Sequence, residues 1–251
     1  MNKKSIQHFI TNVICGFIYN KDERKRLRVV LNSPVLEYMK FIKRDTGFRR
    51  PRFRTFVGYQ ARSLIMGVNN KWVYKFPLRR DNYRELAMRE KRIVDALAPL
   101  SPIHVPNVEL LEWNHRLVRK YEFIRGKSMR RISPELVRQH IDALAAQVAN
   151  FIYTIGQCDP AEIRDLKPAP DIKPGYMFGW CQGDIYDNFM VDTNTMRVVA
   201  FIDWEDAQFG DFAWRMTAER DPIAHEFMLA VRNKYDQIWN KNHPKKKQQK
   251  D

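Results

Sequence analysis

The sequence has few cysteines and histidines and no long apolar run, the features that mark disulfide-rich, zinc-binding and membrane-spanning proteins. Among 251 residues there are three cysteines, Cys15, Cys158 and Cys181, without paired or metal-binding spacing. An odd count without a secretory signal pattern predicts reduced thiols and a cytoplasmic setting. The six histidines are scattered singly, which disfavours a zinc site. No apolar run approaches the roughly 18 residues of a membrane-spanning helix.

Acidic residues are also scarce, since 44 Lys and Arg stand against 29 Asp and Glu and the net charge is +15. The excess gathers at the N-terminus, where Ile6, Phe9, Val13 and Phe17 belong to one apolar helical stripe followed by a basic cluster. A helix of this kind is typical of the surface of an anionic membrane, here the inner face of the cell membrane. Packing on the protein itself or against a partner protein is the alternative. No nucleic-acid motif accompanies the charge.

The most informative stretch combines acids and an amide with two apolar strands. Gln182-Gly183-Asp184 is followed by Asn188, an apolar strand at 189–191, turn residues at 192–195, and a second strand at 198–202 that ends at Asp203. The hairpin predicts that Asn188 and Asp203 lie at the same end. Phosphoryl transfer needs a carboxylate that orients the acceptor hydroxyl and oxygen ligands for Mg²⁺. Asp184 fits the first role, and Asn188 with Asp203 fits the second. Taken singly, each acid also fits a loop cap.

This pattern resembles the aminoglycoside phosphotransferase and choline kinase group, relatives of the protein kinases. The group's motif reads His-Gly-Asp, then Asn, a strand, a turn and Ile-Asp-Trp-Glu, which Ile202-Asp203-Trp204-Glu205 matches. The chain departs from it at Gln182, in place of His, and in the step from Asp184 to Asn188, which is one residue short. The resemblance implies an α+β bilobal protein-kinase-like fold, with a small antiparallel-sheet N-lobe, a mainly helical C-lobe and an N-terminal helical extension. It also implies ATP and Mg²⁺ as cofactors.

The nucleotide-binding lobe is expected upstream of this motif. Strands at 53–57, 64–68 and 72–76 are predicted, with a loop from Gly58 and a turn at Asn69-Asn70. Lys75 in the third strand suits a phosphate-binding lysine, or the wet face of a strand. In a helix at 84–97, Glu90 lies in the apolar stripe and therefore needs a partner. Lys75 is the partner that a kinase-like fold implies, and a nearby arginine is the alternative.

The hinge and the domain boundaries follow from the same interpretation. Residues 121–126 contain Glu122 and Phe123, where such folds meet the nucleotide base. One helix is predicted from Ser133 to Gly156 and a last one over 223–238. The expected division is 1–51 basic extension, 52–126 N-lobe and hinge, 127–243 catalytic C-lobe, and 244–251 basic tail.

The expected function is ATP-dependent phosphorylation of a hydroxyl on a small molecule or sugar, with a bacterial surface glycan or glycolipid favoured by the basic charge. The alternatives are an antibiotic (aminoglycoside-type) kinase, a protein kinase, and a catalytically inactive kinase-like binding module. Few residues separate Asp203 from Asp211, which leaves little room for the activation segment of a protein kinase.

Overall fold

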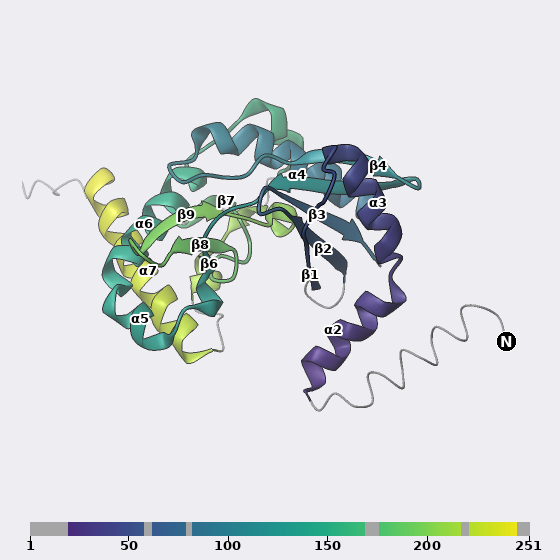
Figure 1. Ribbon diagram of the computed structural model, residues 1–251. Coiled ribbons are helices and arrows are strands. Elements are labelled where there is room, and N and C mark those ends of the chain that lie inside the picture. Colours follow the sequence, from purple (N-terminus) through teal and green to yellow (C-terminus); the bar gives the residue numbers. More distant parts are fainter. Residues whose placement is uncertain (1–19, 58–61, 79–81, 169–175, 217–220, 245–251) are drawn as a thin grey trace, which may run out of the picture. The chain divides into compact units, whose positions relative to one another are not determined.

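The computed structural model describes residues 20–57, 62–78, 82–168, 176–216 and 221–244 (Figure 1). It divides into two compact units. The first unit extends to Met88 and includes Val108–Phe123, while the second contains Arg89–Asn107 and the chain from Ile124 onward. The crossing from Phe123 to Ile124 falls within the segment predicted as the hinge.

The first unit is a five-stranded antiparallel sheet with helices. Its strands follow the order β1-β2-β3-β5-β4. Their bounds are β1 Phe53–Val57, β2 Ser63–Val68, β3 Trp72–Pro77, β4 Glu109–Trp113 and β5 Arg116–Glu122, and the helices are α2 Lys21–Asn32, α3 Val35–Thr46 and the start of α4 Tyr83–Leu97. The three strands expected at 53–76 are present. Asn69 and Asn70 have φ values of 53° and 50°, a left-handed conformation that asparagine tolerates in tight hairpin turns.

Helix α3 belongs to the core of this unit. Tyr38 and Ile42 are buried with β-strand residues, and the Tyr38 ring stacks on Phe76 at a centroid distance of 3.9 Å. The sequence-based boundary at residue 51 therefore separates elements that share one core, because the apolar face of α3 covers the sheet. The stripe predicted within residues 1–19 lies outside the described residues.

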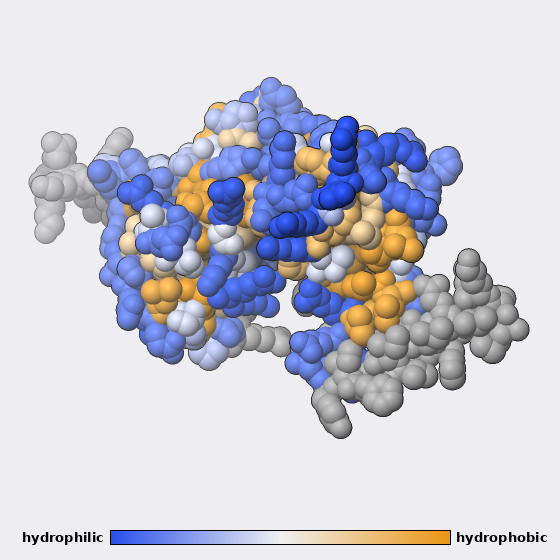
Figure 2. Space-filling view, in the orientation of Figure 1, coloured by the Kyte–Doolittle hydropathy of each residue, from blue (hydrophilic) through white to orange (hydrophobic). Residues whose placement is uncertain are grey.

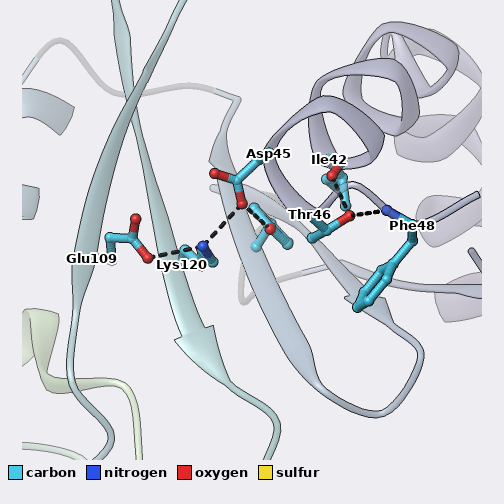
Figure 3. Close-up of polar contacts among 7 residues, drawn as sticks. Ile42, Asp45, Thr46, Phe48, Glu109 and Lys120 are labelled. Carbon is cyan, nitrogen blue, oxygen red and sulfur yellow. Dashed lines mark hydrogen bonds and ion pairs between the residues drawn. The ribbon is translucent and has the colours of Figure 1, made fainter.

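Polar contacts also attach α3 to the sheet (Figure 3). Asp45 accepts hydrogen bonds from the Tyr74 hydroxyl at 2.5 Å and from Lys120 at 3.0 Å, and Lys120 also binds Glu109 at 2.9 Å. Burial opposes the charge of Lys120, but its hydrogen bonds to Glu109 and Asp45 raise its pKa above the ordinary value. Burial and the hydrogen bond to Asp45 likewise raise the pKa of Tyr74. The charge of Lys120 is thus matched by two carboxylates.

The second unit is mainly helical and carries two small antiparallel sheets. One sheet has the order β6-β8-β9 and the other pairs β10 with β7. The bounds are β6 Lys127–Ser128, β7 Phe178–Cys181, β8 Phe189–Asp192, β9 Arg197–Phe201, β10 Gln208–Asp211, α5 Pro134–Gln139, α6 Ile141–Gly156 and α7 Pro222–Asn242. Arg89–Asn107, expected in the N-lobe, clusters with this unit.

The single helix predicted from Ser133 to Gly156 is wrong in one respect. The chain forms two helices, α5 and α6, because His140 leaves helical geometry at φ −121° and ψ 14°. The predicted start is correct, since the Ser133 hydroxyl accepts a hydrogen bond from the Leu136 amide at 3.3 Å. The α6 side chain Phe151 stacks on Phe201 of β9 at 3.7 Å. This contact fixes the hairpin that carries the candidate site.

No helix among the described residues is both long and apolar enough to cross a membrane. Figure 2 shows polar residues over most of the visible surface, with apolar patches between them.

Cys158 and Cys181 are free thiols, as the sequence predicted for these two, and burial raises the pKa of the Cys181 thiol.

Candidate active site

Gln182 joins the two loops that carry the predicted catalytic and metal-binding acids. Its side-chain amide donates to the backbone carbonyls of Ile202 at 3.0 Å and Asp203 at 2.7 Å. Its carbonyl oxygen accepts the Asp184 backbone N–H at 2.9 Å, and the side chain is 1% exposed. Gln182, which stands where the similar motif has His, therefore supports the loop. A glutamine amide supplies two donor hydrogens and an acceptor, which matches the three bonds observed.

Only glycine fits the backbone at position 183, directly before Asp184. Gly183 has φ +105°, and a Cβ at this position would lie 2.4 Å from the Asp206 carbonyl oxygen. The Gly183 carbonyl also accepts a hydrogen bond from the Arg215 guanidinium. The tight turn leaves Asp184 exposed, as a group that acts on a second substrate must be.

The β8–β9 hairpin brings Asn188 and Asp203 to one end, as the sequence predicted. Phe189 pairs with Phe201, and the Ile202 amide donates to the Asn188 carbonyl at 2.8 Å. Both predicted metal ligands directly adjoin these paired residues, despite the shortened step from Asp184. Carboxylate and amide oxygens are hard donors suited to Mg²⁺, which usually keeps waters and substrate phosphates as its other ligands.

The described residues contain no group of three or more His, Cys, Asp or Glu side chains that could hold a metal on its own. A two-residue set such as Asn188 and Asp203 instead fits an ion that arrives with a nucleotide. Asp203 has φ 55° and ψ 71°, a left-handed conformation that, apart from glycine, asparagine and aspartate adopt most readily. Strain of this kind concentrates at functional sites.

Glu90 supports the segment that follows Asp203. It is fully buried in α4, and its Oε1 accepts the Trp204 backbone N–H at 3.2 Å. The sequence predicted that this buried carboxylate needs a partner but did not identify the Trp204 amide. The Lys75–Glu90 pair joins residues of different units and stays a prediction.

Lys75 lies on the side of the first unit's sheet that faces away from α3. Neighbours along a strand point to opposite faces, and Tyr74 on one side of Lys75 belongs to the α3 core. The strand registers place two rows of residues on the other side, which we call the lysine face. These rows are Arg54–Gly67–Val73–Tyr121 and Phe56–Ile65–Lys75–Arg119. Lys75 is 7% exposed, so the alternative of a solvated surface lysine is wrong.

A cavity of about 370 Å³ lies at one end of this unit. Its lining residues are Arg52, Phe53, Arg54, Gly67, Asn69, Asn70 and Phe123. Arg54 and Gly67 belong to the lysine face, and a Cβ on Gly67 would meet no atom within 4 Å. The volume falls in the range of small-molecule sites.

Of the two predicted hinge residues, Phe123 borders this cavity. The Phe123 backbone N–H donates to the Lys71 carbonyl at 2.9 Å, and Phe123 contributes to the lining. Glu122 ends β5 opposite Trp72 and is exposed. Gly58 lies outside the described residues.

Sequence reasoning missed Arg215 and the ion pair from Arg130 to Asp187 at 2.5 Å, because nothing in the local sequence links these arginines to the loop around Asp184.

We expect replacement of Gln182 with Leu to lower the free energy of unfolding by about 2 to 4 kcal/mol, because the Asp184 amide and two carbonyls lose their buried partner. Urea denaturation measures the change. Gln157→Leu, at an exposed glutamine after α6, is the matched control and should change stability by less than about 0.5 kcal/mol. Equal stability of Gln182→Leu and the native chain would contradict the bridging role.

Comparisons with known proteins identify the fold. No protein-family model matches the chain, and a search of curated proteins found no match. Among solved structures, it is similar to the GDP complex of wild-type aminoglycoside 2'-phosphotransferase-IIIa, with TM-score 0.66 and 16% identity over 84% of this chain and 86% of that one. It is also similar to a macrolide 2'-phosphotransferase from Brachybacterium faecium, with TM-score 0.55 and 16% identity over 80% and 82%.

A third similar structure is aminoglycoside-3'-phosphotransferase of type VIII, with TM-score 0.56 and 14% identity over 81% of this chain and 92% of that one. The chain therefore has the bilobal kinase-like fold of antibiotic phosphotransferases, and the predicted fold class is confirmed. The first unit corresponds to a sheet-rich N-lobe and the second to a mainly helical C-lobe.

Proposed function

We propose that this protein is an ATP-dependent phosphotransferase that phosphorylates a hydroxyl group of a small molecule. The observation that carries the proposal is the Gln182 bridge, which holds the Asp184 loop against the segment that bears Asp203. An exposed carboxylate and a pair of hard oxygen ligands, fixed to each other through one buried amide, are what positional catalysis of phosphoryl transfer requires.

In this mechanism Asp184 orients the acceptor hydroxyl and accepts its proton. The hydroxyl oxygen forms a bond to the γ-phosphorus as the bond to the β–γ bridging oxygen breaks and ADP leaves. Asn188 and Asp203 would hold Mg²⁺, which neutralises charge on the phosphates. Glu90 keeps the Trp204 amide, and with it the Asp203 segment, in position.

The lysine face would hold the nucleotide in the first unit. Lys75 would bind its phosphates, and the cavity lined by Gly67 and Phe123 would accept its base. Glu122, Phe123 and the loop from Gly58 complete the predicted nucleotide-binding set. A branched side chain at Gly67 would project into the cavity, which explains the usefulness of glycine here.

Antibiotics are the first acceptor class to test. Solved structures similar in fold include a gentamicin complex and a ternary complex with streptomycin and ATP, both of aminoglycoside phosphotransferases. An anionic surface-glycan hydroxyl is the second candidate. It is favoured by Arg215, whose guanidinium donates to the Gly183 carbonyl and adds positive charge beside Asp184. Arg130 is already paired with Asp187 of the same loop.

The alternative functions receive less support. Only a short 3-10 turn, Trp204–Asp206, and β10 lie between Asp203 and Asp211, which disfavours a protein kinase with an extended activation segment. The intact bridge at Gln182 disfavours a catalytically inactive module, because the departure from the family motif preserves the geometry of the loops.

The function is tested by incubating the native protein with Mg²⁺ and radiolabelled ATP and a panel of acceptors: aminoglycosides, a macrolide, and neutral and anionic sugars. Transfer to one class identifies the acceptor. Nucleotide binding by calorimetry is measured in parallel. No Mg²⁺-dependent nucleotide binding at any concentration would contradict the phosphotransferase proposal itself, whereas binding without transfer in this panel would exclude the two acceptor classes.

The proposal extends to peripheral membrane binding through residues 1–20, on the evidence of the apolar stripe and the basic segment behind it. We expect deletion of Met1–Asn20 to reduce sedimentation with vesicles that contain anionic lipid. Vesicles of neutral lipid are the control, and the native chain should bind them weakly. Unchanged binding of the truncated chain to anionic vesicles would show that the stripe has another role.

A further inference from the structure

Helix α3 has two faces of opposite character. Tyr38 and Ile42 on its inner face are buried in the core of the first unit. Leu36, Lys40 and Lys43 recur at steps of four and three residues, so they form one ridge on the other side of the helix. Both lysines are exposed, and Leu36 is 73% exposed, the highest fraction among the large apolar side chains of the described residues. The ridge thus presents an aliphatic group and two cations to the outside.

The positive charge continues past the end of α3. Only two acids lie between residues 36 and 50: Asp45 is bonded to Tyr74 and Lys120, and Glu37 is exposed. An excess of exposed cations produces a positive potential that attracts anionic partners. We call the exposed apolar and basic residues of this stretch the α3 edge, which consists of Leu36, Lys40, Lys43, Arg44, Arg49 and Arg50.

The apolar groups beside the cations distinguish between anionic partners. Proteins that bind single-stranded nucleic acids add aromatic faces on which the bases stack. Phe48, directly before Arg49, packs instead against the core of the first unit, and the Lys71 ammonium lies 6.0 Å from its ring centroid. An exposed aliphatic side chain such as Leu36 is removed from water when it enters the acyl layer of a membrane. Leucine among lysines and arginines therefore suits an anionic lipid surface better than a nucleic acid.

We propose that the α3 edge is a docking surface for a membrane that contains anionic lipids. The lysines and arginines would contact the lipid phosphates, while Leu36 would enter the apolar layer beneath the headgroups. The α3 edge belongs to the folded first unit, so it is a different surface from the apolar stripe predicted within residues 1–19. It contains none of the residues assigned to phosphoryl transfer, and the inference therefore stands or fails independently of the proposed enzymatic activity.

Sedimentation of the full chain with vesicles at physiological salt tests this inference. The vesicles contain phosphatidylcholine alone or with phosphatidylglycerol. The variant Lys40→Gln/Lys43→Gln removes two cations of the ridge, and the matched control Arg197→Gln/Lys241→Gln removes two exposed cations of the second unit. Since one cation near an anionic surface contributes about fivefold to binding, we expect the ridge variant to bind phosphatidylglycerol vesicles about 25-fold more weakly. The control should stay within about threefold of the native chain.

Leu36→Gln preserves the charge and tests the apolar contribution. It should bind the same vesicles about 5- to 20-fold more weakly, because no aliphatic group enters the acyl layer. Native binding by Leu36→Gln would overturn the inference. Equal binding by the ridge variant and its control would also overturn it, since binding would then follow net charge or the N-terminal stripe. So would a native chain that does not bind phosphatidylglycerol vesicles.

Retention on poly(U) RNA is measured in parallel to test the other anionic partner. If the ridge variant lost RNA binding but kept native vesicle binding, the partner would be a nucleic acid and the inference would be wrong. Melting temperatures establish that each variant is folded. If the ridge variant is unfolded, Arg49→Gln/Arg50→Gln, which lies outside the helix, decides by the same comparison with the control.

Discussion

Replacement of Asp184 with Asn is expected to reduce phosphoryl transfer by about 10²- to 10⁴-fold while nucleotide affinity changes little. The amide keeps the size of the side chain but cannot accept the proton of the acceptor hydroxyl. Asp184 is exposed, and the Asp184–Gln182 contact uses the backbone N–H, so the substitution leaves the Gln182 bridge in place.

Single-turnover transfer and calorimetric ADP binding, both with Mg²⁺, measure the two quantities. Asp206→Asn is the matched control, because Asp206 is an exposed acid on a neighbouring turn of the same unit. It should retain native transfer. Parallel loss of transfer and nucleotide binding in Asp184→Asn would show that the carboxylate serves the nucleotide and that its assignment to the acceptor is wrong.

Replacement of Asp203 should instead abolish the Mg²⁺ dependence of nucleotide binding. Loss of a carboxylate ligand removes most of the ion's attachment to the protein, so we expect ADP affinity in Mg²⁺ to fall about 100-fold, close to its value in EDTA. The choice of variant matters because Asp203 is left-handed at φ 55°. Asparagine tolerates this backbone, whereas alanine adds strain of about 1 kcal/mol.

Asp203→Asn therefore isolates the charge, and Asp203→Ala removes the ligand altogether. Calorimetric titrations with Mg²⁺ and with EDTA, together with melting temperatures, separate lost binding from lost stability. Asp206→Asn again serves as the control. If both Asp203 variants retained native Mg²⁺-dependent affinity, the metal assignment at the end of β9 would be wrong and a kinase-like fold without metal chemistry would be favoured.

Local patterns predicted much of both units. Alternating apolar residues and the Asn-Asn turn predicted strands β1 to β3. The turn at 192–195 predicted the β8–β9 hairpin, and the register of that hairpin brings Asn188 and Asp203 to one end. The division of the predicted helix at His140 was missed because the apolar periodicity continues through the break. The placement of α3 was missed because a basic composition concealed the apolar face that bears Tyr38 and Ile42.

The sequence by itself determined the strands β1 to β3 and the β8–β9 hairpin, the chemical types at the candidate site and the need of buried Glu90 for a partner, because these depend on neighbours a few residues apart. Only the tertiary structure decided which groups meet. Gln182 reaches carbonyls 20 and 21 positions away, Glu90 receives an amide 114 positions away, and Arg119 lies opposite Lys75. Contacts of this range depend on how strands register and loops pack, so no local pattern of residues encodes them.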